Sequence, residues 1–220
     1  MKDKRVLENN NKSVFGWGIV DVNYKLQEKT SYRINGVTTQ KLDWICPYYS
    51  DWREMIRRVH GDSWRSRYIT YADVSILEEW QYLSNFIKWV DSQPNKDWEN
   101  YQLDKDLLGD GKIYSPLSCA YVSSKTNSFV IDAKNSRGTL MIGVATNIES
   151  NIKPYRAACG NPFTRKRVYL GSYSTELEAH KAWQAKKHEF ACQLADLQED
   201  PRVAEALRQR YSPDKDWNNR

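Results

Sequence analysis

The sequence predicts an α+β protein in two parts, and three features of the chain favour this class. Asn35-Gly36 separates two runs of β-forming residues, and this dipeptide is the preferred turn of a two-residue β-hairpin. In residues 51–60 the apolar side chains recur at i, i+3, i+4 and i+7, which is the period of an amphipathic helix. The last third has short β-type runs followed by a long helical stretch, which predicts a small sheet covered by a helix.

The length of 220 residues fits one large domain or two small ones. We expect a disordered polar tail over residues 1–13, an N-terminal domain over 14–133, a second domain over 138–197, and a C-terminal helix and tail over 198–220. A run of about 18 apolar residues, which a membrane-spanning helix needs, does not occur, and the first residues lack the apolar segment of a secretory signal. These features predict an intracellular, cytoplasmic protein with no membrane partner.

The N-terminal part is expected to contain the hairpin and two helices. A strand-like run over residues 19–24 precedes the hairpin, and the first helix covers 51–60. The second helix is predicted over 75–91, with Ser75 and Glu78 as a capping box at its start.

Aromatic residues divide into two groups in this part. Trp52, Trp80 and Trp89 stand at helical spacing among other apolar residues, so they are expected in the core. Trp64, Arg65 and Arg67 fall in an aromatic, Arg-rich connector, so they are expected to be exposed, where an aromatic ring can stack on a base.

The C-terminal part shows a clearer order of elements. Residues 140–145, 154–159 and 167–170 predict three strands, and residues 174–197 a helix that starts with Ser174 or Thr175 as its cap. A last helix is predicted over 200–211, because Asp200 is a good N-cap and Pro201 suits the first turn.

The positive charge of the chain is concentrated in residues 137–195, which hold nine basic and four acidic residues. Strand alternation places some of Arg156, Arg165, Lys166 and Arg167 on the face of the sheet that the helix leaves open. Such a face can reach the phosphates and base edges of double-stranded DNA. The alternative is an ordinary solvated basic face without a ligand.

The same stretch resembles a known DNA-binding family. Gly143-Val144, Tyr155 to Ala158 and the run from Arg167 to Trp183 match, in order and spacing, the motifs of the APETALA/ethylene-response-factor domain. The resemblance covers about residues 138–195, and it implies a three-stranded sheet that enters the major groove. It implies DNA contacts by Arg156, Arg165 and Arg167, while residues 147–153 and 160–164 depart from the family pattern.

A second candidate site lies between Leu103 and Asn127. Asp104 and Asp106 could supply oxygen ligands to a divalent metal, and Asn127 a further one. The usual imidazole base is missing there, since no histidine lies between His60 and His180, and Lys105 could replace it only if burial lowered its pKa strongly. In the alternative interpretation the two aspartates are turn and capping residues of a scaffold hairpin. Recruitment of His60 in space is less favoured, because a histidine after a helix is usually a surface residue.

Most of residues 15–195 resemble phage-encoded HNH homing-endonuclease-like proteins. The motifs that carry this resemblance are Gly16-Trp17-Gly18, residues 46–58, Trp80 to Trp89, Leu103 to Asp106, Lys112 to Cys119, and Asn127. The resemblance implies a ββα-metal-like unit followed by the basic domain.

For function, this resemblance implies DNA binding with metal-dependent nicking or cleavage, in a bacteriophage-infected cell. The catalytic positions would be Asp104, Lys105 and Asn127, with Mg²⁺ or Mn²⁺ held by Asp104 and Asp106. Lys105 stands where active members have His, and Ser118 stands where related proteins have Asn, so the sequence departs from the active pattern at two places.

The sequence leaves two other functions open: a catalytically inactive DNA-binding or regulatory protein on a degenerate HNH scaffold, and an inhibitor of a host protein. Zinc is a less favoured cofactor. The four cysteines are far apart, and a set made of Cys46, His60 and Cys119 lacks the short ligand spacing of zinc sites.

Overall fold

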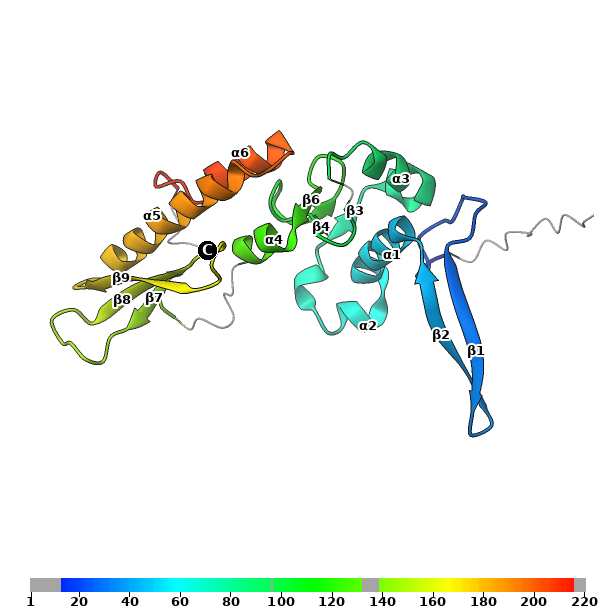
Figure 1. Ribbon diagram of the computed structural model, residues 1–220, viewed down its shortest axis with the longest axis horizontal. Helices are drawn as coiled ribbons and strands as arrows, with labels where there is room; N and C mark the ends of the chain where they lie inside the picture. The colour runs from blue at the N-terminus through cyan, green and yellow to red at the C-terminus, as the bar shows by residue number, and fades with distance from the viewer. Residues whose placement is uncertain (1–12, 96, 132–138, 216–220) are drawn as a thin grey trace, which may run out of the picture.

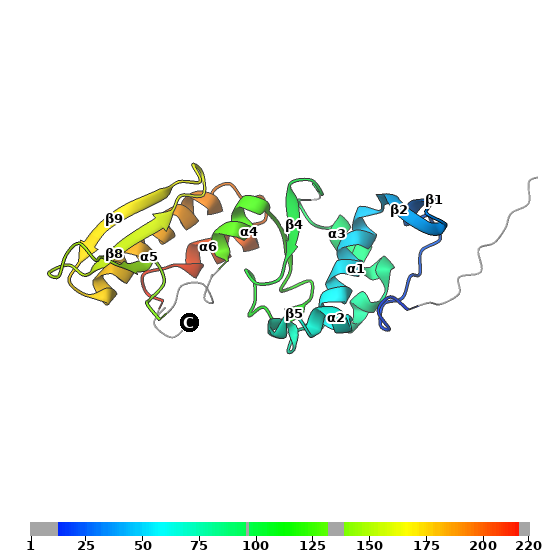
Figure 2. The same cartoon turned by 90° about the horizontal axis from the view of Figure 1, so that it is seen from below.

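The computed structural model describes residues 13–95, 97–131 and 139–215, and the helices and strands in them form an α+β protein. The molecule is elongated, with a long β-hairpin at one end and a three-stranded sheet with its helix at the other (Figures 1 and 2). The described residues contain no helix with both the length and the apolar content that crossing a membrane requires.

The hairpin consists of β1, Gln27–Ile34, and β2, Val37–Ile45. Asn35 and Gly36 have φ values of 51° and 82°, the left-handed conformation that a two-residue turn of this kind needs, so the predicted turn is confirmed. The predicted strand over residues 19–24 is wrong: only Ile19 makes a β-bridge, to Tyr82, because the residues after it find no further strand to pair with.

The first helix, α1, covers Pro47–His60 and is followed by a single turn, α2, at Asp62–Arg65. Pro47 is the first helical residue, where a missing N–H costs no intrahelical hydrogen bond. The helix therefore starts four residues before the predicted position.

The predicted helix over 75–91 is wrong in its first half. Ser75–Ile76 is a short strand, β3, that pairs in parallel with β5, Ile113–Tyr114, and the N–H of Ser75 donates to the carbonyl oxygen of Lys112. A 3₁₀ turn, η2, at Glu78–Gln81 leads into α3, Leu83–Asp91, so Ser75 caps nothing. A second 3₁₀ turn, η1, covers Ile69–Tyr71.

Tryptophans fill the N-terminal core, as the sequence predicts. Trp52, Trp80 and Trp89 are all buried, and the indole N–H of Trp52 donates to the carbonyl oxygen of Trp80 at 2.7 Å. This hydrogen bond joins α1 to η2, and it satisfies a polar atom that would otherwise be costly in a fully buried position.

One strand separates two hydrophobic clusters. β4, Tyr101–Asp104, and β6, Ala120–Ser123, are antiparallel and lead into α4, Ser124–Val130. Because successive side chains of a strand point to opposite faces, Tyr121 belongs to the N-terminal cluster, whereas Ala120 and Val122 belong to the C-terminal one.

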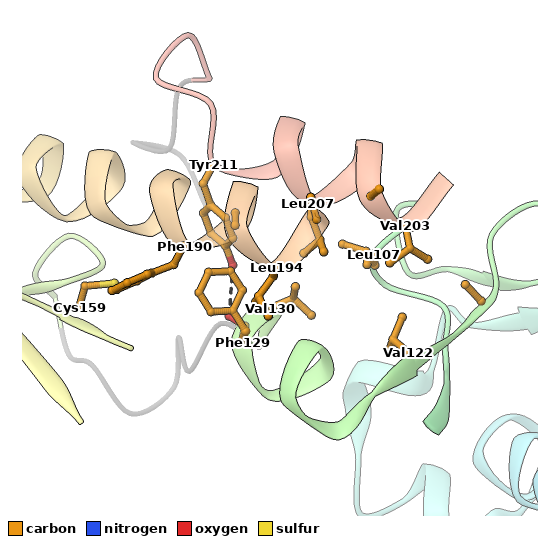
Figure 3. Close-up of a cluster of buried hydrophobic side chains, with 14 of the residues drawn as sticks. Leu107, Val122, Phe129, Val130, Cys159, Phe190, Leu194, Val203, Leu207 and Tyr211 are labelled. Atoms are coloured by element: carbon orange, nitrogen blue, oxygen red, sulfur yellow. Dashed lines mark hydrogen bonds between the residues drawn. The ribbon is translucent and has the colours of Figure 1, made fainter. Parts of the chain in front are cut away.

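The C-terminal cluster joins α4 to two further helices, α5, Glu176–Ala195, and α6, Pro201–Arg210 (Figure 3). In it the hydroxyl of Tyr211 donates to the carbonyl oxygen of Phe129. Arg202 on α6 links the C-terminal helices to the N-terminal part of the protein by hydrogen bonds. Its guanidinium donates to Asp200, to the carbonyl oxygen of Pro116 and to Gln93. The hydrogen bonds from Arg202 outweigh the effect of burial and lower the pKa of Asp200.

The C-terminal sheet has the order β7-β8-β9, all antiparallel, with β7 at Val144–Thr146, β8 at Tyr155–Gly160 and β9 at Arg167–Tyr173. The first strand of this sheet begins four residues after its predicted start, because residues 141 and 142 bond to α5 instead. The N–H of Met141 donates to Glu176, and the carbonyl oxygen of Ile142 lies 2.8 Å from Nδ1 of His180.

The two predicted helix starts are confirmed in this part of the chain. Thr175 and Glu178 form the capping box of α5, and Asp200 caps α6 ahead of Pro201.

Candidate nucleic-acid interface

The β7–β9 sheet has one face against α5 and one face that no helix of the described residues covers (Figures 1 and 2). On β8, Ala157 and Cys159 are buried, and Cys159 belongs to the C-terminal hydrophobic cluster, whereas Arg156 is exposed. On β9, Arg167 and Tyr169 are exposed in the same alternating way. The pleat thus places two guanidiniums and a phenol on the uncovered face.

Small residues separate these long side chains. Arg156 is paired with Ala145 on one side and with Ser172 on the other, and Gly160 is paired with Arg167. The hydroxyls of Tyr169 and Ser172 lie 2.8 Å apart and are hydrogen-bonded. Short side chains therefore form the surface between the cations of the uncovered face, which leaves room for a ligand to approach the backbone.

A structured turn places the other two predicted contacts. The side-chain oxygen of Asn161 accepts hydrogen bonds from the N–H groups of Phe163 and Thr164, at 2.8 and 3.1 Å. The N–H of Asn161 donates to the carbonyl oxygen of Lys166, which closes the loop between β8 and β9. Arg165 and Lys166 are exposed at the end of this turn, directly before Arg167. Three consecutive residues therefore expose cationic side chains where β9 begins.

A basic cleft of about 800 Å³ adjoins the sheet between this turn and α4. Among the described residues, five cationic side chains and no carboxylate line it; the cations are Lys125, Arg165, Lys166, Arg167 and Lys187. The ammonium of Lys125 lies 5.4 Å from the ring centroid of Phe163, which holds α4 beside the turn. Such a lining favours an anionic group, because the charged side chains that line it among residues 13–95, 97–131 and 139–215 are all positive.

Acidic residues are scarce in the sequence of the β7–β9 sheet and its loops. Residues 139–175 contain five basic residues and one acidic residue, Glu149. Arg156, Arg165, Lys166 and Arg167 form no ion pair with the described residues, 13–95, 97–131 and 139–215. The structure thus brings all four predicted DNA-contact residues to one sheet and its adjoining turn.

The Asp104 turn is arranged differently. Asp104 is buried, and its Oδ1 accepts hydrogen bonds from the N–H groups of Asp106 and Leu107, at 3.1 and 2.8 Å. Burial raises the pKa of Asp104, the proximity of Asp106 adds to this, and the two N–H groups oppose it. The carboxylate therefore acts as the cap of its own turn, as in the alternative interpretation of the sequence.

Lys105 is also engaged. Its side chain is only 8% exposed, and its ammonium lies 2.6 Å from Oδ1 of Asp106. The rings of Tyr71 and Tyr114 flank it, with centroids 5.3 and 5.6 Å from Nζ. A carboxylate and two aromatic rings thus hold the ammonium in place.

The other residues predicted for a nuclease site lie elsewhere or have structural partners. Asn127 donates to Gln102 on β4, and it has no hydrogen bond with Asp104 or Asp106 in the described part of the chain. His60 stacks on Trp17 with 4.8 Å between ring centroids, and burial together with Arg65 lowers its pKa. Ser118 donates to the carbonyl oxygen of Ile113.

The side chains near the Asp104 turn do not form a cradle for a metal ion among the described residues. Across the described ranges, no group of three or more His, Cys, Asp or Glu side chains is placed to hold a metal ion, which includes Asp104 with Asp106 and Cys46 with Cys119. A cavity of about 860 Å³ lies beside the turn, and its charged lining is mixed: Asp106, Asp110, Glu205, Arg202, Arg210 and Lys215. The donor set does not fit Mg²⁺ or Mn²⁺, which need several oxygen ligands directed at one point.

Sequence reasoning missed two members of the basic surface. Tyr169 entered the sequence analysis only as part of a family motif. It stands two residues after Arg167 on the same strand, so strand alternation could have marked both side chains as exposed. Lys125 comes from α4, outside the predicted basic domain, and reaches the cleft only because α4 packs beside the β8–β9 turn. Arg65 and Arg67 are exposed as predicted, whereas Trp64 is partly covered by Tyr68 and by the guanidinium of Arg57, 4.1 Å from its ring centroid.

Comparisons of the chain with protein-family models, with curated proteins and with solved structures find no match in any of the three.

Proposed function

We propose that this protein binds duplex DNA through the uncovered face of the β7–β9 sheet and the basic cleft beside it. The observation that carries the proposal is the set of four cations, Arg156, Arg165, Lys166 and Arg167, on one sheet and its turn without an acidic partner among the described residues. Exposed cations on a shaped surface attract the phosphate backbone, and strands can enter a major groove.

In this proposal the surface elements have distinct roles. Arg156 and Arg167 project from the pleated face, where a guanidinium can reach phosphates or a guanine edge. The cleft with Lys125, Arg165 and Lys166 lies at the end of the same strands, so it is suited to the phosphates of the flanking backbone. Tyr169 adds an exposed phenol between the two.

The proposal is limited to binding. A cleavage step needs a general base and a metal cradle, but Oδ1 of Asp104 is engaged by two backbone N–H groups and the Lys105 ammonium by Asp106. These contacts favour the interpretation as a DNA-binding protein without a working nuclease centre.

The test is a salt titration of the affinity of the full chain for a fluorescent duplex, measured by anisotropy. The affinity is expected to fall steeply between about 50 and 200 mM salt, because phosphate binding releases counterions. Arg156→Ala and Arg167→Ala should each weaken binding about five- to ten-fold and reduce the salt slope by about one. Lys181→Ala, which removes an exposed cation of α5, is the matched control and should leave the affinity unchanged. Salt-independent binding, no binding, or equal losses for Lys181→Ala would refute the proposal.

A further inference from the structure

The β1–β2 hairpin is a ribbon with almost no support from the rest of the protein. Every residue of β1 is exposed, and on β2 only Thr39 and Ile45 are partly covered. No residue of either strand is a buried member of the two hydrophobic clusters. An isolated two-stranded ribbon is marginally stable in water, so a surface of this length is expected to have a ligand.

The composition of the ribbon points to a polyanion. Residues 29–41 contain Lys29, Arg33 and Lys41 and no carboxylate, while most of the others carry a hydroxyl or an amide. Acidic residues occur only at the base of the hairpin, and both have partners: Glu28 is paired with Lys25, and Asp43 accepts a hydrogen bond from Thr30. An ordinary exposed hairpin would carry charges of both signs along its length.

The register divides the ribbon into two faces. Arg33 is opposite Thr38, Ser31 is opposite Gln40, and Lys29 is opposite Leu42, which makes one face mainly cationic and polar. The other face ends in an apolar tip, where Ile34 and Val37 are opposite each other and are 53% and 66% exposed. Polar side chains along a ribbon and an apolar wedge at its tip are both known ways of entering a DNA groove.

The position of the ribbon in the molecule would let it contact the same duplex as the sheet. The hairpin projects from the same side of the molecule as the uncovered face of the β7–β9 sheet, at the opposite end of the long axis, and the two views agree on this (Figures 1 and 2). A duplex that lies along this side would meet the sheet at one end and the ribbon at the other.

We infer that the β1–β2 ribbon is a second DNA-binding arm, which inserts into a groove of the same duplex that the sheet binds. This inference rests on the proposed function of the sheet. It implies that the protein covers a longer stretch of DNA than the basic domain alone could cover, with the ribbon adding phosphate contacts through Lys29 and Arg33.

The test compares two double variants of the full chain on a long duplex. Lys29→Ala/Arg33→Ala removes two cations from one face of the ribbon, and Lys88→Ala/Lys181→Ala removes two exposed cations from α3 and α5 as a charge-matched control. The ribbon variant should reduce the salt slope by about two. Each protein should also occlude fewer base pairs at saturation. The control should change neither quantity.

The outcomes separate this inference from the proposed function. If the ribbon variant matches the control in slope and occluded length while Arg156→Ala and Arg167→Ala still weaken binding, the second arm is refuted and the sheet remains the DNA site. If the sheet variants have no effect either, both proposals fail. Ile34→Ser/Val37→Ser provides an independent check, since an inserted tip predicts weaker binding from it at unchanged salt slope.

Discussion

The Asp104 turn and the β7–β9 sheet are both short charged stretches, but they use their charges in different ways. In the turn, the carboxylate of Asp104 accepts from two backbone N–H groups and the ammonium of Lys105 lies against Asp106. On the sheet, Arg156 and Arg167 are exposed and have no ion-pair partner within the described ranges. A polar group whose atoms are engaged by its own chain serves the fold, whereas an exposed charge without intramolecular partners is available to a ligand.

The cause of this difference is the backbone around each group. The turn from residue 104 to 107 directs two N–H groups at a side chain that is already buried, so the carboxylate is held by its own chain. A pleated strand directs its N–H and C=O groups sideways to its neighbours, and the side chains on the uncovered face receive no such bonds. Predictions of stability should therefore differ between the two regions.

Substitution of a glycine in each region gives the largest expected contrast. Gly143 has a φ of 82°, and a methyl group there would overlap the indole of Trp183, so Gly143→Ala should destabilise the protein by about 3 kcal/mol or more. Gly111 has a φ of 77°, but a methyl group there would meet the carboxylate end of Asp106, which can move. Gly111→Ala should therefore cost only about 1–2 kcal/mol. Urea denaturation measures both, and equal losses would contradict the close packing of Gly143 on Trp183 of α5.

Two substitutions of Asp104 separate its capping role from its charge. Asp104→Ala leaves two N–H groups without their acceptor and should cost about 1–2 kcal/mol. Asp104→Asn keeps an acceptor oxygen and removes the buried charge, so it should be at least as stable as the wild type at pH 7.

The difference in stability between Asp104→Asn and the wild type should change with pH in one direction. Because burial raises the pKa of Asp104 in the folded state, its stabilising contribution is complete below the unfolded pKa of about 4 and is lost as the pH rises through the folded value. The stability of Asp104→Asn relative to wild type should increase from about pH 4 to pH 7. A constant difference in denaturation midpoint across this range would show that Asp104 is not strained by its burial.

Much of the fold could be predicted because the signals are local. Asn35-Gly36 determines the hairpin turn, and the capping box of Thr175 and Glu178 lies within one helical turn. Only the first half of the helix predicted over 75–91 is wrong, because Ser75 pairs with Ile113, which is far along the chain and leaves no trace in the sequence around Ser75.

The candidate site was predictable to the same degree. Strand alternation accounts for the exposure of Arg156 and Arg167, whereas Arg165 and Lys166 lie in the turn before β9 and follow from the local cluster of basic residues in the sequence. Asp104 could not be resolved in this way, since a carboxylate beside a glycine-rich turn suits a metal and a backbone cap equally, and only the directions of the N–H groups decide between them. Lys125 depends on the packing of α4 against Phe163, which no local pattern indicates.

The smallest expected effect on stability belongs to the residues with the largest expected effect on binding. Arg156→Ala and Arg167→Ala should each change the free energy of unfolding by less than about 0.5 kcal/mol, because exposed side chains without partners contribute little to stability. Urea denaturation of each variant, alongside its anisotropy titration, checks both quantities on one preparation. A loss of stability comparable with that of Asp104→Ala would mean that these arginines hold the sheet together, and the contrast between the two regions would then be lost.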